Sequence, residues 1–337
     1  MVASSNNLFT PKYIYWELCD FCNLHCRHCF ANSSPEKSFF ADKTLVLSKI
    51  LDISQKVAVP IRFGGGEPLL YPQLLELLHE CKKHSIPLAI TTNGTLLSAE
   101  KANQLKNCNL QSLTISIDGT EKFNDYLRGS GNFVRACRGL ENALSAGIRP
   151  SVSFTATAYN YMNLSEYVDY FYKKGIREFY IFRYIPDISE NRSKHLDLDG
   201  KMLMETTATI HTIEKVYPDI TVNYEKKGHL DFLLTNDLSS ASCKFTRGIM
   251  TIKFDGTVVV CAAISKNLGN IYFDSLEQIY ANIVTEIKSI NTIPNECSTC
   301  SFSNTCKGGC KCYSYIAFGD YTHMDNCCFK DLEPIHK

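Results

Sequence analysis

The distribution of cysteines is the feature of this sequence that most limits how the chain can fold. Sixteen cysteines occur in 337 residues, four of them at positions 19, 22, 26 and 29 and nine between Cys243 and Cys328. The long stretch between the two groups holds only Cys81, Cys108 and Cys137. A secreted disulfide scaffold is usually short and bridged throughout. The asymmetry therefore favours metal ligation by thiolates, which requires a reducing compartment, and we expect a cytoplasmic location.

The charge balance gives no long-range attraction to polyanions. The chain has 35 Lys and Arg against 35 Asp and Glu, so its net charge is zero. We therefore expect neither nucleic acid nor an anionic membrane surface as a partner. The longest apolar runs, such as residues 258–264, are far too short to span a bilayer, and the first 12 residues do not resemble a signal peptide.

Strand-like and helix-like segments alternate from residue 13 to about 183. Asp42 precedes the first helical pattern as a plausible N-cap. Repeated β/α units predict a parallel sheet covered by helices, either curled into a barrel or doubly wound, with chemistry at the C-terminal strand ends. The predicted strands are 13–18, 60–63, 87–92, 112–117, 149–157 and 177–183, and the predicted helices are 42–57, 72–84, 98–106, 132–146 and 163–174.

The pattern changes after about residue 185. Residues 199–216 predict a helix, 248–254 and 257–261 predict a hairpin turning at Asp255-Gly256, and 275–289 predict another helix. The tail at 297–328 is rich in cysteine and glycine without a helical period, so we expect it to need a metal for folding. We predict an N-terminal tail at 1–12, a core domain with a linker helix at 13–235, and a small cysteine-rich domain at 236–337.

The first cysteine group admits two interpretations. It reads Cys19-Asp-Phe-Cys22-Asn-Leu-His-Cys26-Arg-His28-Cys29. Two CxxC pairs could hold zinc, but a gap of three residues between the pairs is cramped for a structural zinc site. Alternatively, Cys22, Cys26 and Cys29 hold three irons of a 4Fe-4S cubane. The fourth iron then lacks a protein ligand, as catalysis requires, and Cys19 is a bystander.

The stretch from Cys22 to Cys29 resembles the signature of the radical S-adenosyl-L-methionine (radical SAM) enzymes, including the aromatic residue before the third cysteine, His28. The resemblance covers about residues 13–185 and implies a partial (β/α)6 TIM-like barrel within an α/β fold. It also implies SAM-binding roles for residues at the following strand ends: Gly65, Gly66, Glu67, Asn93, Ser116, Asp118 and Arg128. Taken singly, the glycines, Asn93-Gly94 and Asp118-Gly119 are equally typical of turns and caps, and Arg128 of an exposed surface.

The resemblance implies radical chemistry. SAM would chelate the open iron, one electron from a flavodoxin-like or ferredoxin-like reductant would break its C5'–S bond, and a 5'-deoxyadenosyl radical would abstract a hydrogen atom from the substrate. The protein would supply positioning and exclusion of water. Because oxygen destroys such clusters, we expect an anaerobic setting.

The second cysteine group resembles the SPASM extension found on many radical SAM enzymes. Its spacing implies two auxiliary 4Fe-4S clusters, although CxxC also suits zinc. The resemblance implies that Cys243, Cys261 and Cys310 hold the first cluster. Cys297, Cys300, Cys306 and either Cys327 or Cys328 would hold the second. Cys328 is preferred because the family often has an aspartate two or three residues before this ligand, and Asp325 lies three residues before Cys328.

The sequence departs from sulfatase-maturing relatives at two points. No cysteine stands a few residues before Cys243, so Asp237, another group or an open iron completes the first auxiliary cluster. Ala262 follows Cys261 where those relatives have an aspartate base, which argues against formylglycine formation. Cys312 is left spare, as a buried thiol.

Relatives with a SPASM domain mostly modify peptides, so we expect an oxidoreductase that matures a ribosomally made precursor peptide (RiPP maturation) by forming or cleaving a bond. Only 18 residues precede Cys19, so we expect no leader-binding domain, and a separate protein could supply that recognition. One alternative is a small-molecule enzyme of a cofactor or haem pathway. Another is a non-catalytic iron–sulfur or zinc module.

Overall fold

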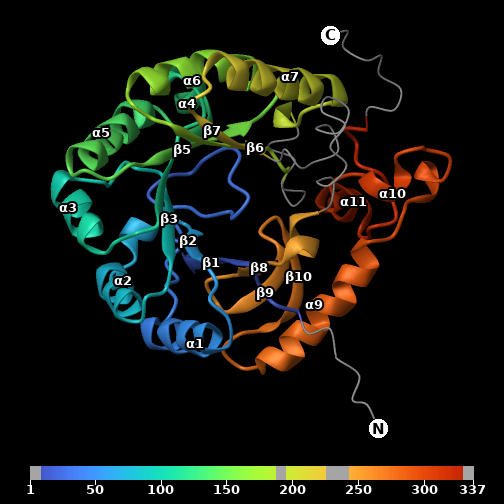
Figure 1. Cartoon of the computed structure of the whole chain (residues 1–337), viewed down its shortest axis with the longest axis horizontal. Helices are drawn as coiled ribbons and strands as arrows, with labels where there is room; N and C mark the ends of the chain where they lie inside the picture. The colour runs from blue at the N-terminus through green and yellow to red at the C-terminus, as the bar shows by residue number, and fades with distance from the viewer. Residues whose placement is uncertain (1–8, 187–194, 225–242, 329–337) are drawn as a thin grey trace.

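The computed structural model describes residues 9–186, 195–224 and 243–328, and its strands form one curved ten-stranded sheet with helices on the outside (Figure 1). The sheet order is β10-β9-β8-β1-β2-β3-β4-β5-β6-β7. Strands β1 to β7 run parallel to one another, and β8 is parallel to β1. The strands are β1 Tyr13–Cys19, β2 Ile61–Gly65, β3 Leu88–Thr92, β4 Ser112–Ser116, β5 Ser151–Ala156, β6 Glu178–Arg183, β7 Thr221–Tyr224, β8 Ile249–Ile252, β9 Thr257–Cys261 and β10 Ile264–Asn270.

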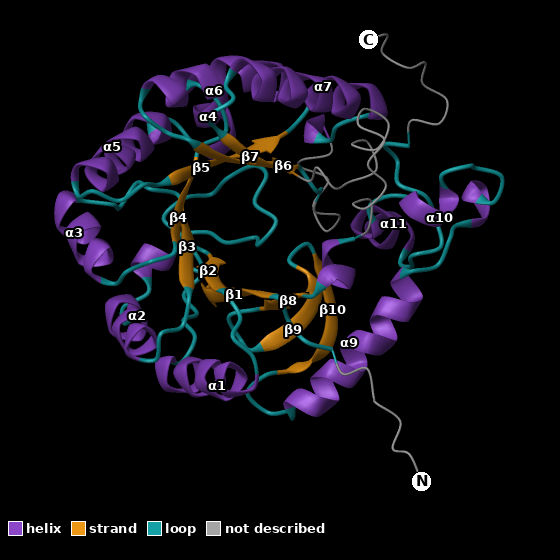
Figure 2. Ribbon diagram, in the orientation of Figure 1, coloured by secondary structure: helices purple, strands orange, loops and turns teal. Residues whose placement is uncertain are grey.

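The helices cover the convex side of the sheet and continue into the C-terminal region (Figure 2). They are α1 Lys43–Lys56, α2 Leu74–Lys83, α3 Ala99–Asn107, α4 Glu121–Arg128, α5 Asn132–Ser145, α6 Leu164–Lys173, α7 Gly200–Val216, α9 Leu276–Ile290, α10 Ser303–Cys306 and α11 Lys311–Phe318. Asp42 caps α1 by accepting a hydrogen bond from the Leu45 amide at 2.9 Å, as predicted. The α/β partial barrel is thus confirmed.

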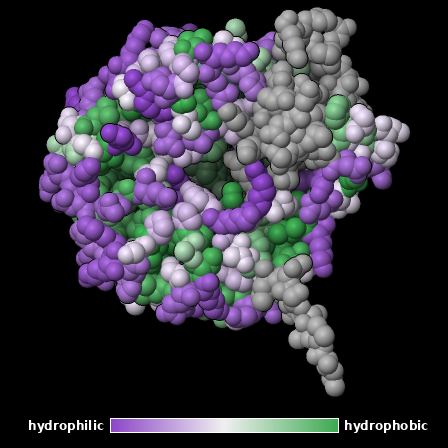
Figure 3. Space-filling model, viewed as in Figure 1, coloured by the Kyte–Doolittle hydropathy of each residue, from purple (hydrophilic) through white to green (hydrophobic). Residues whose placement is uncertain are grey.

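Alternation along the strands separates an apolar outer face from a polar inner face. Outward side chains such as Trp16, Phe63 and Phe154 are fully buried and form the core beneath the helices. The inner face presents Arg62, whose guanidinium donates to the hydroxyls of Thr91 and Thr114 at 3.1 and 2.8 Å. Many inner side chains are only half-buried, and the surface is hollowed over the middle of the ring (Figure 3).

Several elements were not predicted from the sequence. Strand β7 follows α7, strand β10 pairs antiparallel with β9, and α4 follows the loop after β4. The tail at 297–328 contains α10 and α11, although its sequence shows no helical period.

The predicted hairpin, β8 and β9, extends the barrel sheet beyond β1. One sheet therefore links the chain before residue 225 to the chain after 242. The proposed boundary near residue 235 and Asp237 lie outside the described residues, so that domain division stays a prediction. Within the described residues, no helix has the length and apolar character needed to cross a bilayer.

Candidate functional site

The three cysteines of the first motif lie on the loop between β1 and α1, which runs across the inner side of the ring (Figure 1). Burial raises the pKa of the Cys22 thiol to about 11 and that of Cys26 to about 12, and neighbouring Cys29 contributes to both. The Cys22 amide donates to the Ser34 carbonyl at 3.2 Å, and the Cys29 amide to Cys26 at 3.2 Å. The loop thus brings the three thiols together.

Cys19 has a different environment at the end of β1. It is fully buried, and its Sγ faces the carbonyl oxygens of Phe21 and Glu67 at 3.4 and 3.7 Å. Its thiol therefore donates to the backbone of the two loops that it joins. This arrangement agrees with the interpretation of Cys19 as a bystander.

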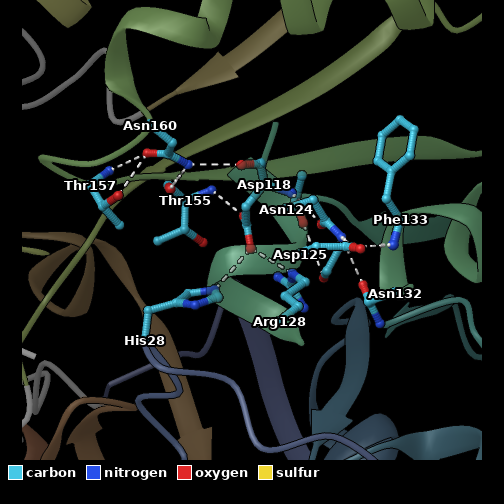
Figure 4. Close-up of polar contacts among 12 residues, drawn as sticks. His28, Asp118, Asn124, Asp125, Arg128, Asn132, Phe133, Thr155, Thr157 and Asn160 are labelled. Carbon is cyan, nitrogen blue, oxygen red and sulfur yellow. Dashed lines mark hydrogen bonds and ion pairs between the residues drawn. The ribbon is translucent and has the colours of Figure 1, made fainter. Parts of the chain in front are cut away.

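A buried network of polar contacts joins His28, Asp118 and Arg128 (Figure 4). Asp118 has no exposed surface, and its Oδ2 accepts from Arg128 Nε at 2.5 Å and lies 2.9 Å from His28 Nε2. Its Oδ1 accepts from the Thr155 amide at 2.7 Å. Burial alone would raise the pKa of Asp118, but the charges of Arg128 and His28 hold it below its ordinary value.

Arg128 is the last residue of helix α4, which positions its side chain next to Asp118. The C-terminal end of α4 is fixed to the cysteine loop, because Arg27 donates through its amide to Leu127 O at 2.8 Å and through Nε to Tyr126 O at 2.9 Å. The Arg128 guanidinium thus lies near Cys26 and Cys29. A buried positive charge next to three thiols offsets the negative charge that they acquire as thiolates.

The glycine loop after β2 is held against the cysteine loop. Gly65 has a φ of +106°, and a Cβ on Gly66 would lie 2.0 Å from the Phe21 carbonyl oxygen. Glu67 is buried, and its carboxylate accepts from Thr92 Oγ1 at 2.6 Å and the Asn93 amide at 2.8 Å. Glu67 therefore joins the loops after β2 and β3, and its predicted contact with SAM stays a prediction.

Asn93 and Ser116 complete the predicted set at the same strand ends. Asn93 Nδ2 donates to Asn23 Oδ1 at 2.9 Å and lies 3.8 Å from Cys22 Sγ, so the loop after β3 reaches the cysteine loop. Ser116 Oγ accepts from Ser153 Oγ at 3.2 Å on the inner face. The structure thus brings every predicted residue of the barrel motif to one end of the ring.

The C-terminal cysteines form two groups. Cys243 lies near Cys261 and Cys310, and burial raises the pKa of the Cys243 thiol to about 12. Cys297 lies near Cys300, Cys306 and Cys328, and burial raises its pKa as well. These groups have the same members as the two ligand sets that the sequence resemblance implies, and their role as cluster ligands stays a prediction.

Cys327 faces away from both groups. Its Sγ is buried, accepts from Arg183 Nη2 at 2.9 Å and lies 2.8 Å from the Leu198 carbonyl oxygen. Cys328, by contrast, is near Cys297. This arrangement supports the preference for Cys328 as the ligand.

Arg183 is a residue that sequence reasoning missed. It ends β6, and its Nη1 and Nη2 bind the Asp325 carboxylate at 2.7 and 2.9 Å. Asp325 also accepts from the Cys310 and Cys327 amides at 3.0 and 2.9 Å, while Arg183 stacks 3.7 Å from the centre of the Tyr313 ring. The sequence signal that could have identified Arg183 is its position at the end of the predicted strand 177–183. Arg183 thereby anchors the C-terminal cysteine loops to the barrel.

The donor sets fit iron–sulfur clusters, because the side chains grouped at each place are thiols, the ligands that such clusters take. His28 Nδ1 is buried without a hydrogen-bond partner among the described residues, so it offers a polar contact to a bound molecule.

Family comparisons match both regions. Residues 16–171 match the radical SAM superfamily, and residues 243–301 match SPASM, an iron–sulfur cluster-binding domain.

Among curated proteins, the AdoMet-dependent heme synthase of Methanosarcina barkeri is 24% identical over 97% of this chain and 98% of its own length. The mycofactocin maturase MftC of Mycobacterium ulcerans is 33% identical over 48% of this chain and 44% of its own length.

Solved structures share the fold at low identity. SuiB of Streptococcus suis bound to its precursor peptide SuiA superimposes with a TM-score of 0.79 at 20% identity, covering 95% of this chain and 77% of SuiB. A structure of anSMEcpe with bound AdoMet gives 0.78 at 20% identity, covering 94% of this chain and 91% of that protein. These likenesses support the arrangement of the fold.

Proposed function

Because the chain carries a radical SAM domain followed by a SPASM domain, we propose that it is an enzyme that activates a peptide by abstracting a hydrogen atom. The radical SAM fold binds a 4Fe-4S cluster and SAM, and the SPASM domain binds iron–sulfur clusters. Bound together and reduced by one electron, the first cluster and SAM supply a 5'-deoxyadenosyl radical. The observation that supports this function is the set of Cys22, Cys26 and Cys29 beside the buried Arg128.

The barrel residues have defined tasks in this proposal. Cys22, Cys26 and Cys29 would hold the cluster and leave one iron for SAM. Arg128 offsets the charge of the thiolates, and Asp118 fixes both Arg128 and His28 in place. The half-buried, hydroxyl-rich inner face, including Thr91 and Ser112, offers hydrogen bonds to a substrate in the hollow.

A peptide substrate is supported by the likeness to SuiB, which was solved with its precursor peptide, and by the hydroxyls of the inner face, which can bind neutral amides. Arg128, Arg183 and Lys253 already have carboxylate partners in Asp118, Asp325 and Glu17. Arg62 on the inner face binds hydroxyls instead and is the cation that a carboxylate of a haem precursor would meet. A separate leader-binding protein and a flavodoxin-like or ferredoxin-like reductant are the partners that this function implies.

A haem-pathway enzyme is the second candidate. It is favoured by the end-to-end match to the heme synthase of Methanosarcina barkeri, in contrast to the half-length match to the maturase. In that case the substrate would be a small iron porphyrin, without a leader sequence or a recognition partner.

The test is anaerobic reconstitution with iron and sulfide, followed by reductant and SAM. We expect 5'-deoxyadenosine by liquid chromatography, and none from a Cys26→Ala variant. Parallel reactions would contain either the small peptides encoded beside this gene or an iron coproporphyrin, with products followed by mass spectrometry. A mass change only in the porphyrin would overturn the peptide assignment. Absence of 5'-deoxyadenosine under all conditions would overturn the radical SAM activity itself.

A further inference from the structure

Arg62 lies on β2 and is half-buried, with its guanidinium on the inner face of the barrel. All its described hydrogen-bond partners are neutral oxygen atoms. They are Thr91 Oγ1 at 3.1 Å, Thr114 Oγ1 at 2.8 Å, Ser112 Oγ at 3.4 Å, the Ile90 carbonyl at 3.5 Å and the Tyr13 hydroxyl. Strands β1, β3 and β4 thus hold the guanidinium in one place without neutralising its charge.

Arg62 differs in this respect from the two buried arginines at the strand ends. Arg128 and Arg183 each bind the carboxylate of an aspartate. Within the described part of the chain, no carboxylate forms an ion pair with Arg62. Glu178 lies on the same face of the sheet, but its Oε1 accepts from the Tyr180 hydroxyl at 2.9 Å. A cation that has no counter-ion and lies in a sheltered hollow favours the binding of an anion.

The groups around the guanidinium retain hydrogen-bond donors for such an anion. Arg62 Nη2 carries two hydrogens, and its one contact among the described residues is the long one with Ser112. The hydroxyls of Thr91 and Ser112 accept from Arg62, so each keeps its own hydrogen to donate. A carboxylate placed against the guanidinium would therefore receive hydrogen bonds from the arginine and from hydroxyls.

Two aromatic rings adjoin the same place. The Arg62 guanidinium lies 5.5 Å from the centre of the Tyr180 ring. Phe182 follows two residues later on β6 and so faces the same side of the sheet. The two rings are nearly parallel, at 17°, with their centres 6.2 Å apart, and Phe182 is 37% exposed. They offer a flat apolar surface beside the cation.

We propose that Arg62, Tyr180 and Phe182 form a subsite for a substrate carboxylate that is attached beside a flat apolar group. The guanidinium and the neighbouring hydroxyls would bind the carboxylate, and the rings would contact the apolar group. A glutamate next to an aromatic residue in a peptide has this chemistry, and so does a propionate of an iron porphyrin. The inference rests on the proposed function in one respect, namely that the substrate binds in the hollow.

The experiment measures binding to the reconstituted full chain in the presence of SAM, by anaerobic isothermal titration calorimetry. One pair of probes is iron coproporphyrin and its neutral tetra-amide. The other pair is an end-blocked peptide that contains phenylalanine followed by glutamate, and the same peptide with glutamine instead. We expect at least one acid to bind about 10- to 100-fold more tightly than its amide, the range typical of a charge-assisted hydrogen bond. The pair with the larger preference identifies the source of the carboxylate.

Variants assign the preference to the subsite. Arg62→Gln should remove the preference for the acid, whereas Phe182→Ala should weaken the binding of acid and amide alike. Arg177→Gln is the matched control and should leave the preference unchanged. Arg177 also lies over a tyrosine, 4.0 Å from the centre of the Tyr172 ring, but its Nε binds the Asp219 carboxylate at 2.9 Å.

Two results would overturn the proposal. One is that the unaltered protein binds neither acid more tightly than its amide, a result that does not depend on any variant folding. The other is a preference for the acid that survives Arg62→Gln. Formation of 5'-deoxyadenosine is measured on the same samples. A preference for the acid without SAM cleavage would refute the proposed radical reaction and leave the subsite intact, whereas SAM cleavage without that preference would refute the subsite alone.

Discussion

The two cysteine-rich regions of this molecule are supported in different ways. The N-terminal group follows β1, a strand with neighbours on both sides, and the buried Asp118–Arg128 pair fixes its surroundings. Of the C-terminal cysteines, Cys261 ends β9 of the same sheet, whereas those from 297 to 328 lie on short helices of three, four and eight residues and the loops between them. The segment from 297 to 328 is joined to the barrel by the ion pair between Arg183 and Asp325 and by the Tyr313 hydroxyl, which donates to the Tyr184 carbonyl.

This difference suggests that the barrel site is held in place by the protein fold, whereas the C-terminal cysteine loops need bound metal to keep their structure. Helices shorter than about 12–15 residues are marginal in water, so the C-terminal segments need tertiary contacts or ligation to persist. The barrel loop instead receives its geometry from the sheet and from polar contacts between protein groups, such as those of Arg27 and Arg128. We therefore expect that loss of iron from the barrel abolishes activity but leaves the barrel folded. Loss of iron from the C-terminal region should unfold that region.

Replacing one barrel ligand should have the largest effect on activity. Cys26→Ala should abolish detectable SAM cleavage and remove about four irons, because three thiolates are needed to hold the cubane. The loss should exceed the roughly 10–100-fold typical of changing a residue that only supports a metal ligand. Iron analysis and 5'-deoxyadenosine formation measure both effects.

Cys19→Ala provides the control from the same loop. Cys19 donates to backbone carbonyls, so its replacement should retain the iron and most of the activity. Equal loss in the two variants would instead support the four-cysteine interpretation of this loop.

Removing the metal should destabilise the C-terminal region much more than the barrel. After anaerobic chelation, amide exchange in residues 297–328 should accelerate by about 100-fold or more, whereas exchange in the barrel strands should change little. Hydrogen exchange with mass spectrometry reports both regions in one experiment. Similar acceleration in β3 and β4 would contradict the proposed difference.

The Arg183–Asp325 pair offers a way to weaken the C-terminal region with its ligands intact. Arg183→Met leaves the buried Asp325 carboxylate without its charge partner, and breaking such a pair costs about 3–5 kcal/mol. We expect loss of auxiliary iron and faster exchange around Asp325, while SAM cleavage persists at the barrel.

Arg183→Lys is the conservative comparison. Lysine keeps the positive charge but cannot make the bidentate contact with the Asp325 carboxylate. We therefore expect a loss of auxiliary iron and an acceleration of exchange smaller than those of Arg183→Met. If Arg183→Met instead removes the iron of the barrel cluster first, the pair supports the barrel and not the C-terminal region.

The sequence predicted the barrel well because its signals are local. Six strands, their flanking helices and the residues at the strand ends all follow from hydrophobic pattern and turn residues. Helix α4 was missed because it is only eight residues long, and β10 because its sequence, ISKNLGN, becomes a strand by pairing with β9. Tertiary pairing thus overrides weak local preference.

The candidate site was predicted as a set of positions, but not as a set of contacts. The sequence placed Glu67 and Asp118 at strand ends, yet their carboxylates are buried and satisfied within the protein. Arg183 and Asp325 are 142 residues apart, so no spacing rule could pair them.

The smallest expected effect concerns Lys311 and tests whether its positive charge influences the reduction potentials of both auxiliary clusters. Lys311 is 2% exposed, and its Nζ donates to the carbonyls of Thr292 and Tyr321, both at 2.9 Å. Its charge acts on Cys297 and Cys306 of one group and on Cys243 of the other. A buried cation near a cluster favours the reduced form, because reduction adds negative charge.

Lys311→Met should therefore lower the midpoint potential of both auxiliary clusters, by roughly tenfold in the reduction equilibrium, or about 59 mV for one electron. Redox titration monitored by electron paramagnetic resonance would measure this in a protein with Cys22, Cys26 and Cys29 replaced by alanine. Lys307→Met is the matched control, since Lys307 is half-buried and bound to Asn291 Oδ1 at 2.9 Å, where water screens its charge. A shift in only one cluster would place Lys311 with that cluster alone. In the protein with all barrel cysteines present, Lys311→Met should leave the midpoint potential of the barrel cluster unchanged. An equal shift there would mean that the substitution acts on the whole protein and not on the auxiliary clusters.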